Sequence, residues 1–503
     1  MRKTPVVSSS ALTPEAVASG SLVPREERER PRAMGRGSPV GFHQLGSCLS
    51  PVAARMADSL ESIAIGRMSP IAVPDPSRGK ARRIWIANGE EVTSPRRSED
   101  EPTVLSKVRA FEARYLFYPT EDDLLISFSE PRESFMEYLT GLLGYSKPPR
   151  VLFPRRVSSP YFLIDSVLAD DDLMARLRAI TAGGQWSLEP HYESRRVLLL
   201  ADSLGLGFSR TRRDLVVGGL IDQCNDKEFF KRLADELDIP RVPGVCVETL
   251  EEVSAALLSS GPGSSTTSWM LRKAVNAGGL GNLFGDRESL LKALPTYCTG
   301  GRILVEPFLD LSLTLGSLVR LSEEGCFFVG IDSQRIEEAG WTGFSYPYID
   351  DRFAGTVRDY SLRIAARMHR NGARGYLNLD FGVVRNGETE RSLVALESNL
   401  RHNGFSHILD LAGRYFQDGP PPRHIQFVSN VTVSSPGITF PGLLGTLRAI
   451  TVDGESVLIE GRGRIRGVIP ILPAYAGSCG LAIFGETADY VDRVHEAAVT
   501  ALA

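Results

Sequence analysis

The chain has 503 residues, enough for two or three domains with cores of their own. Its formal net charge is −4, and no strongly basic stretch alternates with aromatic residues, so we expect no nucleic-acid partner. No apolar run approaches the roughly 20 residues of a membrane-spanning helix, and the N-terminus lacks the apolar segment of a secretory signal. The six cysteines are scattered without a Cys-x-x-Cys pair, which favours a reducing cytoplasm over a zinc site or a disulfide framework.

The first 80 residues are rich in Ser, Pro, Gly and Arg and have no sustained hydrophobic period. This composition predicts a disordered extension over residues 1–80. A wrongly assigned start is the alternative, because Met34, Met56 and Met68 could each initiate the chain. We expect no chemistry in this segment.

Short strand and helix patterns alternate over residues 81–225, which predicts an α/β domain. The strand patterns lie at Arg82–Ala87, Leu124–Phe128 and Arg150–Phe153, and helical patterns lie at Ser134–Leu143 and Asp171–Ile180. Gly205-x-Gly207 resembles a fragment of a dinucleotide-binding fingerprint, but the third glycine is missing, which favours a turn.

A helix is predicted to start after Asn225, which can cap it, with Glu228 placed as in a capping box. The first turn of this helix contains Lys227, where a cation is unfavourable for the helix dipole. That conflict indicates a functional role for Lys227, although an ordinary surface lysine is the simpler explanation.

A glycine-rich loop follows the strand predicted at Trp269–Val275. Gly278, Gly279 and Gly281 would let backbone N–H groups approach phosphates, and Lys273 on the strand would add a positive charge. An ordinary turn is the alternative, and the pattern is not a P-loop because no Gly-Lys-Ser/Thr follows. The next strand ends at Glu306-Pro307, where a carboxylate followed by Phe308 and Leu309 could read an adenine edge.

Two strands, Tyr376–Val384 and Ser392–Leu400, flank Asn386-Gly387, a strong hairpin signal. Because side chains alternate along a strand, Glu397, Asn399 and Arg401 share one face, and the turn brings Asp380 back beside Glu397. Carboxylate and amide oxygens are ligands that Mg²⁺ takes, and an adjacent guanidinium suits a developing oxyanion. The alternative is an amphipathic hairpin with a solvated polar face.

A helix is predicted over Asp359–Arg370, and prolines 420–422 mark a boundary before a smaller C-terminal segment. In that segment we predict strands near 446–459 and 464–472 and a helix near 487–502. Arg462, Arg464 and Arg466 alternate on a predicted strand, where they could bind a carboxylate-rich substrate, although a solvated strand face is the simpler explanation. Residues 341–348 are predicted to form an aromatic loop that lines the substrate cleft or packs against the core, and Gln334 is a weaker cleft candidate.

The order of these features, over about residues 226–410, resembles the ATP-grasp superfamily. Within it, the chain is most similar to the family of the peptide ligase from pheganomycin biosynthesis. The stretches that carry the resemblance are Arg272 to Asn282, Gly372 to Phe381 and Glu397 to Gly404. The resemblance implies an α/β fold with three parts: a pre-ATP-grasp domain at 81–225, an ATP-grasp core at 226–419 and a small C-terminal domain at 420–503.

The resemblance also implies ATP and Mg²⁺ as cofactors and assigns roles. Lys227, Lys273 and the loop glycines Gly278, Gly279 and Gly281 would hold ATP phosphates, and Glu306 and Leu309 would hold the adenine. Asp380, Glu397 and Asn399 would bind Mg²⁺, and the catalytic Arg401 would steady the acyl-phosphate and tetrahedral intermediates. No covalent enzyme intermediate is expected.

The chain departs from that family at Ser398, where an aliphatic residue is usual, and at His402–Ile408, which replaces a Lys-Gly-Gly-Thr-Thr-His-Pro type of continuation. The substrate pocket therefore need not match. We expect a cytoplasmic ligase that joins a carboxylate to an amine or peptide in peptide natural-product biosynthesis. A ligase for a small non-peptide metabolite and a non-catalytic, regulatory ATP-binding protein are the alternatives, and a homodimer stays open.

Overall fold

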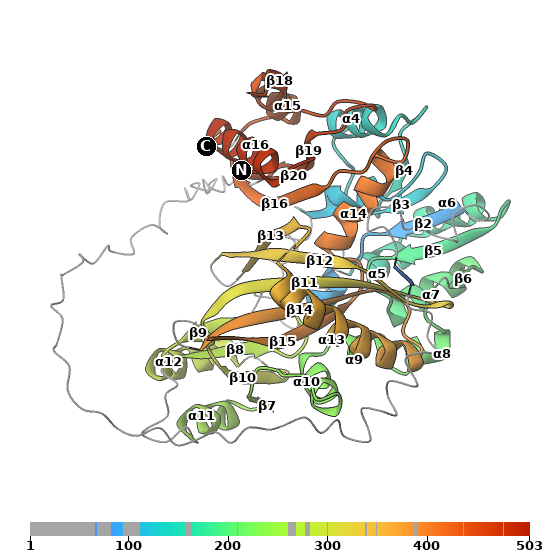
Figure 1. The fold of residues 1–503 in the computed structure, drawn as a ribbon. Helices are drawn as coiled ribbons and strands as arrows, with labels where there is room; N and C mark the ends of the chain where they lie inside the picture. The colour runs from blue at the N-terminus through green and yellow to red at the C-terminus, as the bar shows by residue number, and fades with distance from the viewer. Residues whose placement is uncertain are drawn as a thin grey trace, which may run out of the picture. The chain divides into compact units, whose positions relative to one another are not determined.

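The computed structural model describes most of the chain from residue 82 onward (Figure 1). The described ranges are 66–67, 82–93, 111–156, 162–208, 210–259, 268–276, 282–298, 300–337, 340–348, 350–386, 390–435, 437–475 and 477–503. The predicted extension at 1–80 lies outside them except for β1 (Gly66–Arg67), which pairs in parallel with Phe327 and Phe328.

The first sheet has the parallel order β4-β3-β2-β5-β6, as alternating strands and helices predict. Its strands are β2 (Arg82–Ile86), β3 (Leu124–Ile126), β4 (Arg150–Leu152), β5 (Trp186–Pro190) and β6 (Gly207–Phe208). The helices with them are α2 (Glu90–Thr93), η1 (Ala113–Phe117), α4 (Glu133–Leu143), α5 (Leu163–Leu168), α6 (Asp171–Thr181) and α7 (Arg195–Leu204). Gly205 has φ 65° and ends α7, so the prediction of a turn there is confirmed.

Three helices, α8 (Arg213–Val217), α9 (Leu220–Cys224) and α10 (Lys227–Glu236), lead into the next part. The prediction that Asn225 caps α10 is wrong. Asp226 is the cap, and its carboxylate accepts from the backbone N–H of Glu228 and Phe229. Asn225 is buried and instead donates to the carbonyl oxygens of Ile221 and Leu400.

A four-stranded antiparallel sheet, β7-β10-β8-β9, carries the strand before the glycine loop. Its strands are β7 (Val245–Val247), β8 (Trp269–Lys273), β9 (Leu283–Gly285) and β10 (Ile303–Pro307), and its helices are α11 (Leu250–Ser259) and α12 (Arg287–Tyr297). Leu271, Ile303 and Val305 fill a small core against Leu257 and Leu294. One face of β8 therefore packs against this small core.

The largest sheet carries the predicted hairpin, β14 (Gly375–Asn386) and β15 (Glu390–Leu400), at one edge (Figure 1). The order continues through β11 (Leu311–Ser322), β12 (Gly325–Glu337), β13 (Gly340–Tyr346), β16 (His424–Thr432), β20 (Ser478–Gly485) and β19 (Gly467–Tyr475). Helix α13 (Asp351–Arg370) packs on β11, β12 and β14, and α14 (Gly404–Tyr415) follows β15. The helix predicted at 359–370 thus begins eight residues earlier.

Three sequence predictions are wrong in and near the C-terminal segment. The strand predicted near 446–459 is wrong at its start, because residues 440–449 form the helix α15. Thr439 caps this helix, and a proline lies in its first turn. Arg462, Arg464 and Arg466 precede β19 and are not on a strand. The aromatic stretch at 341–348 is mostly strand β13, paired with β12 and β16.

The remaining elements are the short pair β17 (Thr451–Val452) and β18 (Glu455–Ser456), and the helix α16 (Ala488–Leu502), close to its prediction. Among the helices of the described ranges, none combines the length and the apolar composition that crossing a bilayer requires.

Candidate functional site

A cavity of about 1030 Å³ lies where the hairpin face meets β8, β10 and the first sheet's loops. Six residues predicted for the site line it: Glu306, Leu309, Asp380, Glu397, Asn399 and Arg401. They come from β10 and the loop after it, β14, β15 and the residue after β15. The structure therefore brings together residues that are up to 95 positions apart in the chain.

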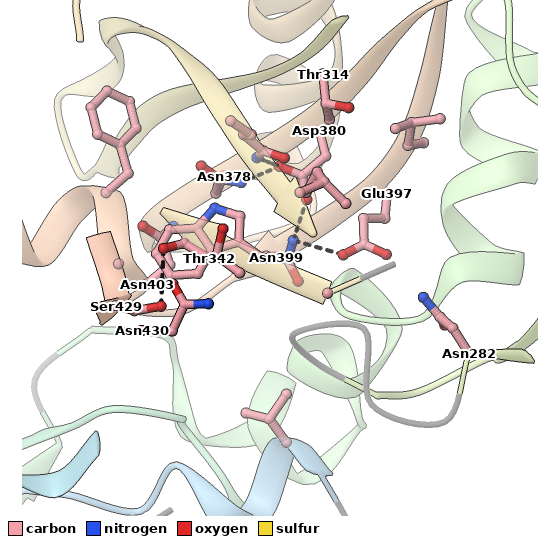
Figure 2. Close-up of a pocket in the computed structure, with 18 of the residues that line it drawn as sticks. Asn282, Thr314, Thr342, Asn378, Asp380, Glu397, Asn399, Asn403, Ser429 and Asn430 are labelled. Carbon is pink, nitrogen blue, oxygen red and sulfur yellow. Dashed lines mark hydrogen bonds between the residues drawn. The ribbon is translucent and has the colours of Figure 1, made fainter. Parts of the chain in front are cut away.

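Asp380 and Glu397 are direct partners in the β14–β15 register, and Asn378 is the partner of Asn399. The Nδ2 group of Asn399 lies 3.1 Å from Asp380 Oδ2 and 3.4 Å from Glu397 Oε1, so it bridges the two carboxylates. Asn378 Nδ2 donates to Asp380 Oδ1 over 2.7 Å. Figure 2 shows this group of four side chains directed toward one another.

The two carboxylates have opposite electrostatic surroundings. Burial, reinforced by the charge of Glu397, raises the pKa of Asp380. Burial would also raise the pKa of Glu397, but the charges of Lys227, Arg272 and Arg401 outweigh it and lower that pKa. The pair thus holds negative charge that the protein compensates at Glu397 and leaves largely uncompensated at Asp380.

A second layer of polar groups comes from β12. Gln334 Nε2 donates to Asp380 Oδ1 over 2.6 Å, and Asp332 lies on the same strand, two residues earlier. Asp332 accepts from the backbone N–H of Gly316 over 2.9 Å. A Cβ atom at Gly316 would lie 2.4 Å from Asp332 Oδ1 and 2.9 Å from Gln334 Nε2, so only glycine leaves room for both. Gln334 is a cleft residue, as predicted, but Asp332 is not predicted by any sequence signal.

Arg272 supplies the main positive charge on the β8 side of the cavity. Its guanidinium bonds to Glu397 and lies 3.6 Å from Glu306 Oε2. Lys227 is buried behind Glu397, with Nζ 3.5 Å from Glu397 Oε2 and 2.9 Å from the carbonyl oxygen of Asn276. Lys227 is therefore in contact with the site but is not part of the cavity wall.

Lys273 is directed away from this cluster. Because side chains alternate on β8, Lys273 lies on the face opposite Arg272. Its Nζ donates to the carbonyl oxygen of Tyr297 over 2.8 Å and lies 4.5 Å from the centre of that ring. Tyr297 ends α12, where a cation is favourable for the helix dipole. The predicted phosphate-binding glycines Gly278, Gly279 and Gly281 lie outside the described residues.

Glu306 is buried and makes an ion pair of 2.5 Å with Lys231 of α10. Lys231 also donates to the carbonyl oxygen of Val242 over 2.5 Å. Lys231 lies four residues after Lys227, so both lysines are on one face of α10. This spacing could have predicted Lys231 as a site residue. Next to Glu306 on the cavity wall, Phe308 stacks on Phe284, with ring centres 5.5 Å apart.

Arg401 lies at the junction between the hairpin and the first sheet's loops. Its guanidinium bonds to the side-chain oxygen of Asn225, the residue that the sequence had predicted as a helix cap. Ser398 faces the opposite side of β15 and donates to the carbonyl oxygen of Cys224 over 2.7 Å. Ser398 thus anchors β15 to α9 and is not among the residues that line the cavity.

A cluster of three or more His, Cys, Asp or Glu side chains that could hold a metal ion is absent from the described ranges. The oxygen-rich pair Asp380 and Glu397, with Asn399, has only two carboxylates. This donor set suits a hard cation that shares its coordination with other oxygens, and it does not suit zinc.

Comparisons with known proteins identify the fold that carries this cavity. Residues 112–206 match the family described as the pre ATP-grasp domain. The structure is similar to biotin carboxylase from Campylobacter jejuni in complex with an ATP analogue, with a TM-score of 0.53 and 14% identity, covering 84% of this chain and 91% of that one. The chain therefore has the ATP-grasp fold.

Two further proteins are similar to this chain. The biotin carboxylase domain of 2-oxoglutarate carboxylase from Hydrogenobacter thermophilus, in complex with MgADP, ADP and bicarbonate, has a TM-score of 0.51 and 14% identity, covering 83% of this chain and 90% of that one. The arginine-specific large chain of carbamoyl phosphate synthase from Geobacillus stearothermophilus is 28% identical over 193 residues. That match covers 36% of this chain and 17% of the curated relative, so it spans a small part of the larger protein.

Proposed function

We propose that this protein is an ATP-dependent ligase that joins a carboxylate to an amine and forms an amide or peptide bond. The observation that carries the proposal is the paired Asp380 and Glu397 next to Arg401, in the cavity of an ATP-grasp fold. Relatives with this fold have been seen with an ATP analogue and with MgADP, which supports the same nucleotide here.

The residues present fit Mg²⁺ and ATP. Asp380 is buried beside a second carboxylate, and a divalent cation bound there would neutralise the charge that raises its pKa. We propose that Asp380, Glu397 and Asn399 hold Mg²⁺, and that Arg272 and Lys227 balance the phosphates together with the loop of Gly278, Gly279 and Gly281. Glu306 and Leu309 would hold the adenine, with the stacked Phe284 and Phe308 beside it.

In the proposed reaction the carboxylate attacks the γ-phosphoryl group and gives an acyl phosphate and ADP. The amine then displaces phosphate from the acyl carbon and gives the amide. The bound Mg²⁺ would supply charge neutralisation, and this chain's residues would orient the reactants. Arg401 presents a fixed guanidinium to the oxyanion that develops at the acyl carbon, and its contact with Asn225 holds it there.

The cavity wall away from the carboxylate pair supports a substrate larger than a small metabolite. Beyond Asn403, the wall includes Trp341, Leu472 and Tyr475, which are apolar or aromatic. Figure 2 shows Thr342, Asn403, Ser429 and Asn430 at this end, away from Glu397. Since a nucleotide would fill only part of about 1030 Å³, we favour a peptide or amino-acid conjugate as the product.

The direct test supplies ATP, Mg²⁺ and pools of acids and amines, and measures ADP and amide. ADP with amide is the expected result, and AMP with pyrophosphate would contradict an acyl-phosphate route. Glu397→Ala and Arg401→Ala are each expected to lower turnover by at least about 100-fold, because each removes charge that stabilises the transition state. Arg391→Ala, at an exposed position of the same strand, is the matched control and should retain turnover. Full turnover in both site variants would contradict the assigned centre.

A further inference from the structure

One end of the cavity is built by the first sheet's loops and is not used by the nucleotide or the metal residues. We call it the Arg114 pocket, and its wall consists of Gly89, Val92, Phe111, Arg114, Tyr115 and His191. These residues come from the loop after β2, from α2, from η1 and the residues before it, and from the residue after β5. Sequence patterns predict none of them as site residues.

Arg114 is half-buried and has no acidic partner within salt-bridge distance among the described residues. Its guanidinium lies over the rings of Phe111 and Tyr115, at 5.5 Å and 5.2 Å from their centres. Within the described part of the chain, its side-chain hydrogen bond runs to the hydroxyl of Tyr115, over 3.3 Å. Stacking on aromatic faces leaves the planar edge of a guanidinium available to an anion.

Two carboxylates whose charges act on Tyr115, those of Glu90 and Glu112, accept hydrogen bonds from other groups. Glu112 accepts from the backbone N–H of Phe128 and from Ser129 Oγ, the latter over 2.8 Å. Glu90 accepts from the backbone N–H of Leu163 over 2.9 Å, and burial raises its pKa well above the ordinary value. By contrast, Arg272 on the opposite wall is neutralised by Glu397 and Glu306. The two ends of the cavity thus differ in charge balance.

The Arg114 pocket is connected to the catalytic strand by contacting rings. Tyr115 meets His191 edge to face at 5.3 Å, and His191 stacks near His402 at 6.5 Å. His402 is the residue after Arg401, and Arg401 lines the same cavity. Burial, together with the positive charge of Arg114, holds the pKa of His191 well below the ordinary value, so this histidine is neutral. A bound anion would therefore meet Arg114 without competition from a second fixed cation at His191.

We propose that the Arg114 pocket binds a second oxyanion of the ligase substrate, a carboxylate or a phosphate group that does not react. The inference rests on the proposed function, since it assigns the class of substrate for the same cavity. A guanidinium with a free edge binds either group through two parallel hydrogen bonds. Gly89 keeps the approach open, because a Cβ atom there would lie 2.9 Å from the Tyr115 hydroxyl. Of the two anions we favour a carboxylate, as an amino acid or peptide terminus would supply.

The test measures protection of Arg114 from the arginine reagent phenylglyoxal, followed by peptide mass spectrometry on the full chain. The probes are succinate, its neutral analogue succinamide, and inorganic phosphate. We expect succinate to slow modification of Arg114 by about tenfold when it is present at about ten times its dissociation constant, by mass action. We expect succinamide to have no effect. Better protection by phosphate than by succinate would assign the site to a phosphate-bearing substrate.

Calorimetry with the same probes measures how tightly variants at Arg114 bind them. Arg114→Leu should weaken succinate binding by roughly 10- to 100-fold, as the loss of a charged hydrogen-bond donor predicts. Arg114→Lys should recover part of it as a point charge, which a misfolded pocket would not do. Arg176→Leu is the matched control, because Arg176 is exposed on α6, a helix that accompanies the same sheet. This variant should bind succinate as the wild type does.

Protection of Arg114 by neither anion, or unchanged binding in Arg114→Leu, would overturn the proposal. Because these readouts do not need turnover, they are separate from the ligase assay. If the anions protect Arg114 but no acid and amine pair yields ADP, then the subsite stands and the ligase assignment is wrong. If ligase turnover is found and Arg114→Leu leaves the KM of substrates that carry a second anion unchanged, then the pocket has another role.

Discussion

The two adjacent cations of β8, Arg272 and Lys273, lie on opposite faces of the strand. Arg272 bonds to Glu397 in the cavity, and Lys273 donates to the end of α12 on the opposite face. The Gly-rich loop after them makes either residue a reasonable phosphate partner from sequence alone. The structure favours Arg272, because the packing of Leu271 fixes which face of the strand meets the small core.

Arg272→Ala and Lys273→Ala should therefore differ in effect. Arg272→Ala is expected to lower kcat/KM for ATP by roughly 10- to 100-fold, the value of one charge-assisted contact. Lys273→Ala should cost less than about tenfold, through a looser α12. Steady-state kinetics of ADP release measure both. Equal losses, or a larger loss for Lys273→Ala, would return the phosphate role to Lys273 as the sequence predicts.

At the scale of secondary-structure elements, the hairpin was predictable and its partners were not. Asp380 and Glu397 belong to neighbouring strands joined by a turn with a clear signal, so alternation alone brings them together. Gln334 reaches Asp380 from β12, and Arg114 comes from η1, more than 200 residues earlier in the chain. Their positions depend on how sheets and loops pack, which no local pattern encodes.

Local sequence patterns also gave a wrong prediction at two elements, α15 and α10. The apolar residues near 446 have strand character, but the cap at Thr439 starts a helix before them. Asn225 and Asp226 are both good caps, and the buried contact of Asn225 with Arg401 removes it from that role. In both cases a competing interaction nearby determined the element.

The start of α14 depends on a close approach that only glycine permits. A Cβ atom at Gly404 would lie 2.3 Å from the Trp341 ring, which is packed between β13 and the helix. Gly404→Ala should therefore lower the free energy of unfolding by about 1–3 kcal/mol, the usual cost of overpacking. Urea denaturation measures it. Gly419→Ala, where a Cβ atom would meet nothing within 4 Å, should change stability by less than about 0.5 kcal/mol. Equal stability of the two variants would show that Trp341 moves freely.

At the scale of the whole molecule, three buried histidines join the first sheet's loops to the α14 region. His402 and His407 pack among Phe117, Tyr118 and Tyr376, and His191 packs against Tyr115 and His402. Burial, and then the charges of Arg114, Arg210 and Arg414 around them, lower all three pKa values well below the ordinary value. The folded protein therefore keeps these histidines neutral, whereas the unfolded chain protonates them near pH 6.5.

This difference makes stability depend on pH with a definite sign. Below about pH 6.5 the unfolded state binds more protons, so the free energy of unfolding falls as the pH falls. Each such histidine contributes up to about 1.4 kcal/mol per pH unit. In His407→Phe, a ring of similar shape replaces an imidazole whose nitrogens have no hydrogen-bond partner among the described residues. The variant should lose about 1 kcal/mol less than the wild type between pH 6.5 and 5.5, because the unfolded histidine is already half protonated at pH 6.5.

Urea unfolding at pH 7.5, 6.5 and 5.5 measures this slope. Phe117→Leu provides the control, because it changes a ring that contacts His407 and removes no titratable group, and its slope should equal that of the wild type. If His407→Phe keeps the full acid slope, then His407 is charged in the folded state and the junction must contain a counter-ion. If instead the slope falls as expected, the burial of a neutral His407 is one source of the protein's loss of stability in acid.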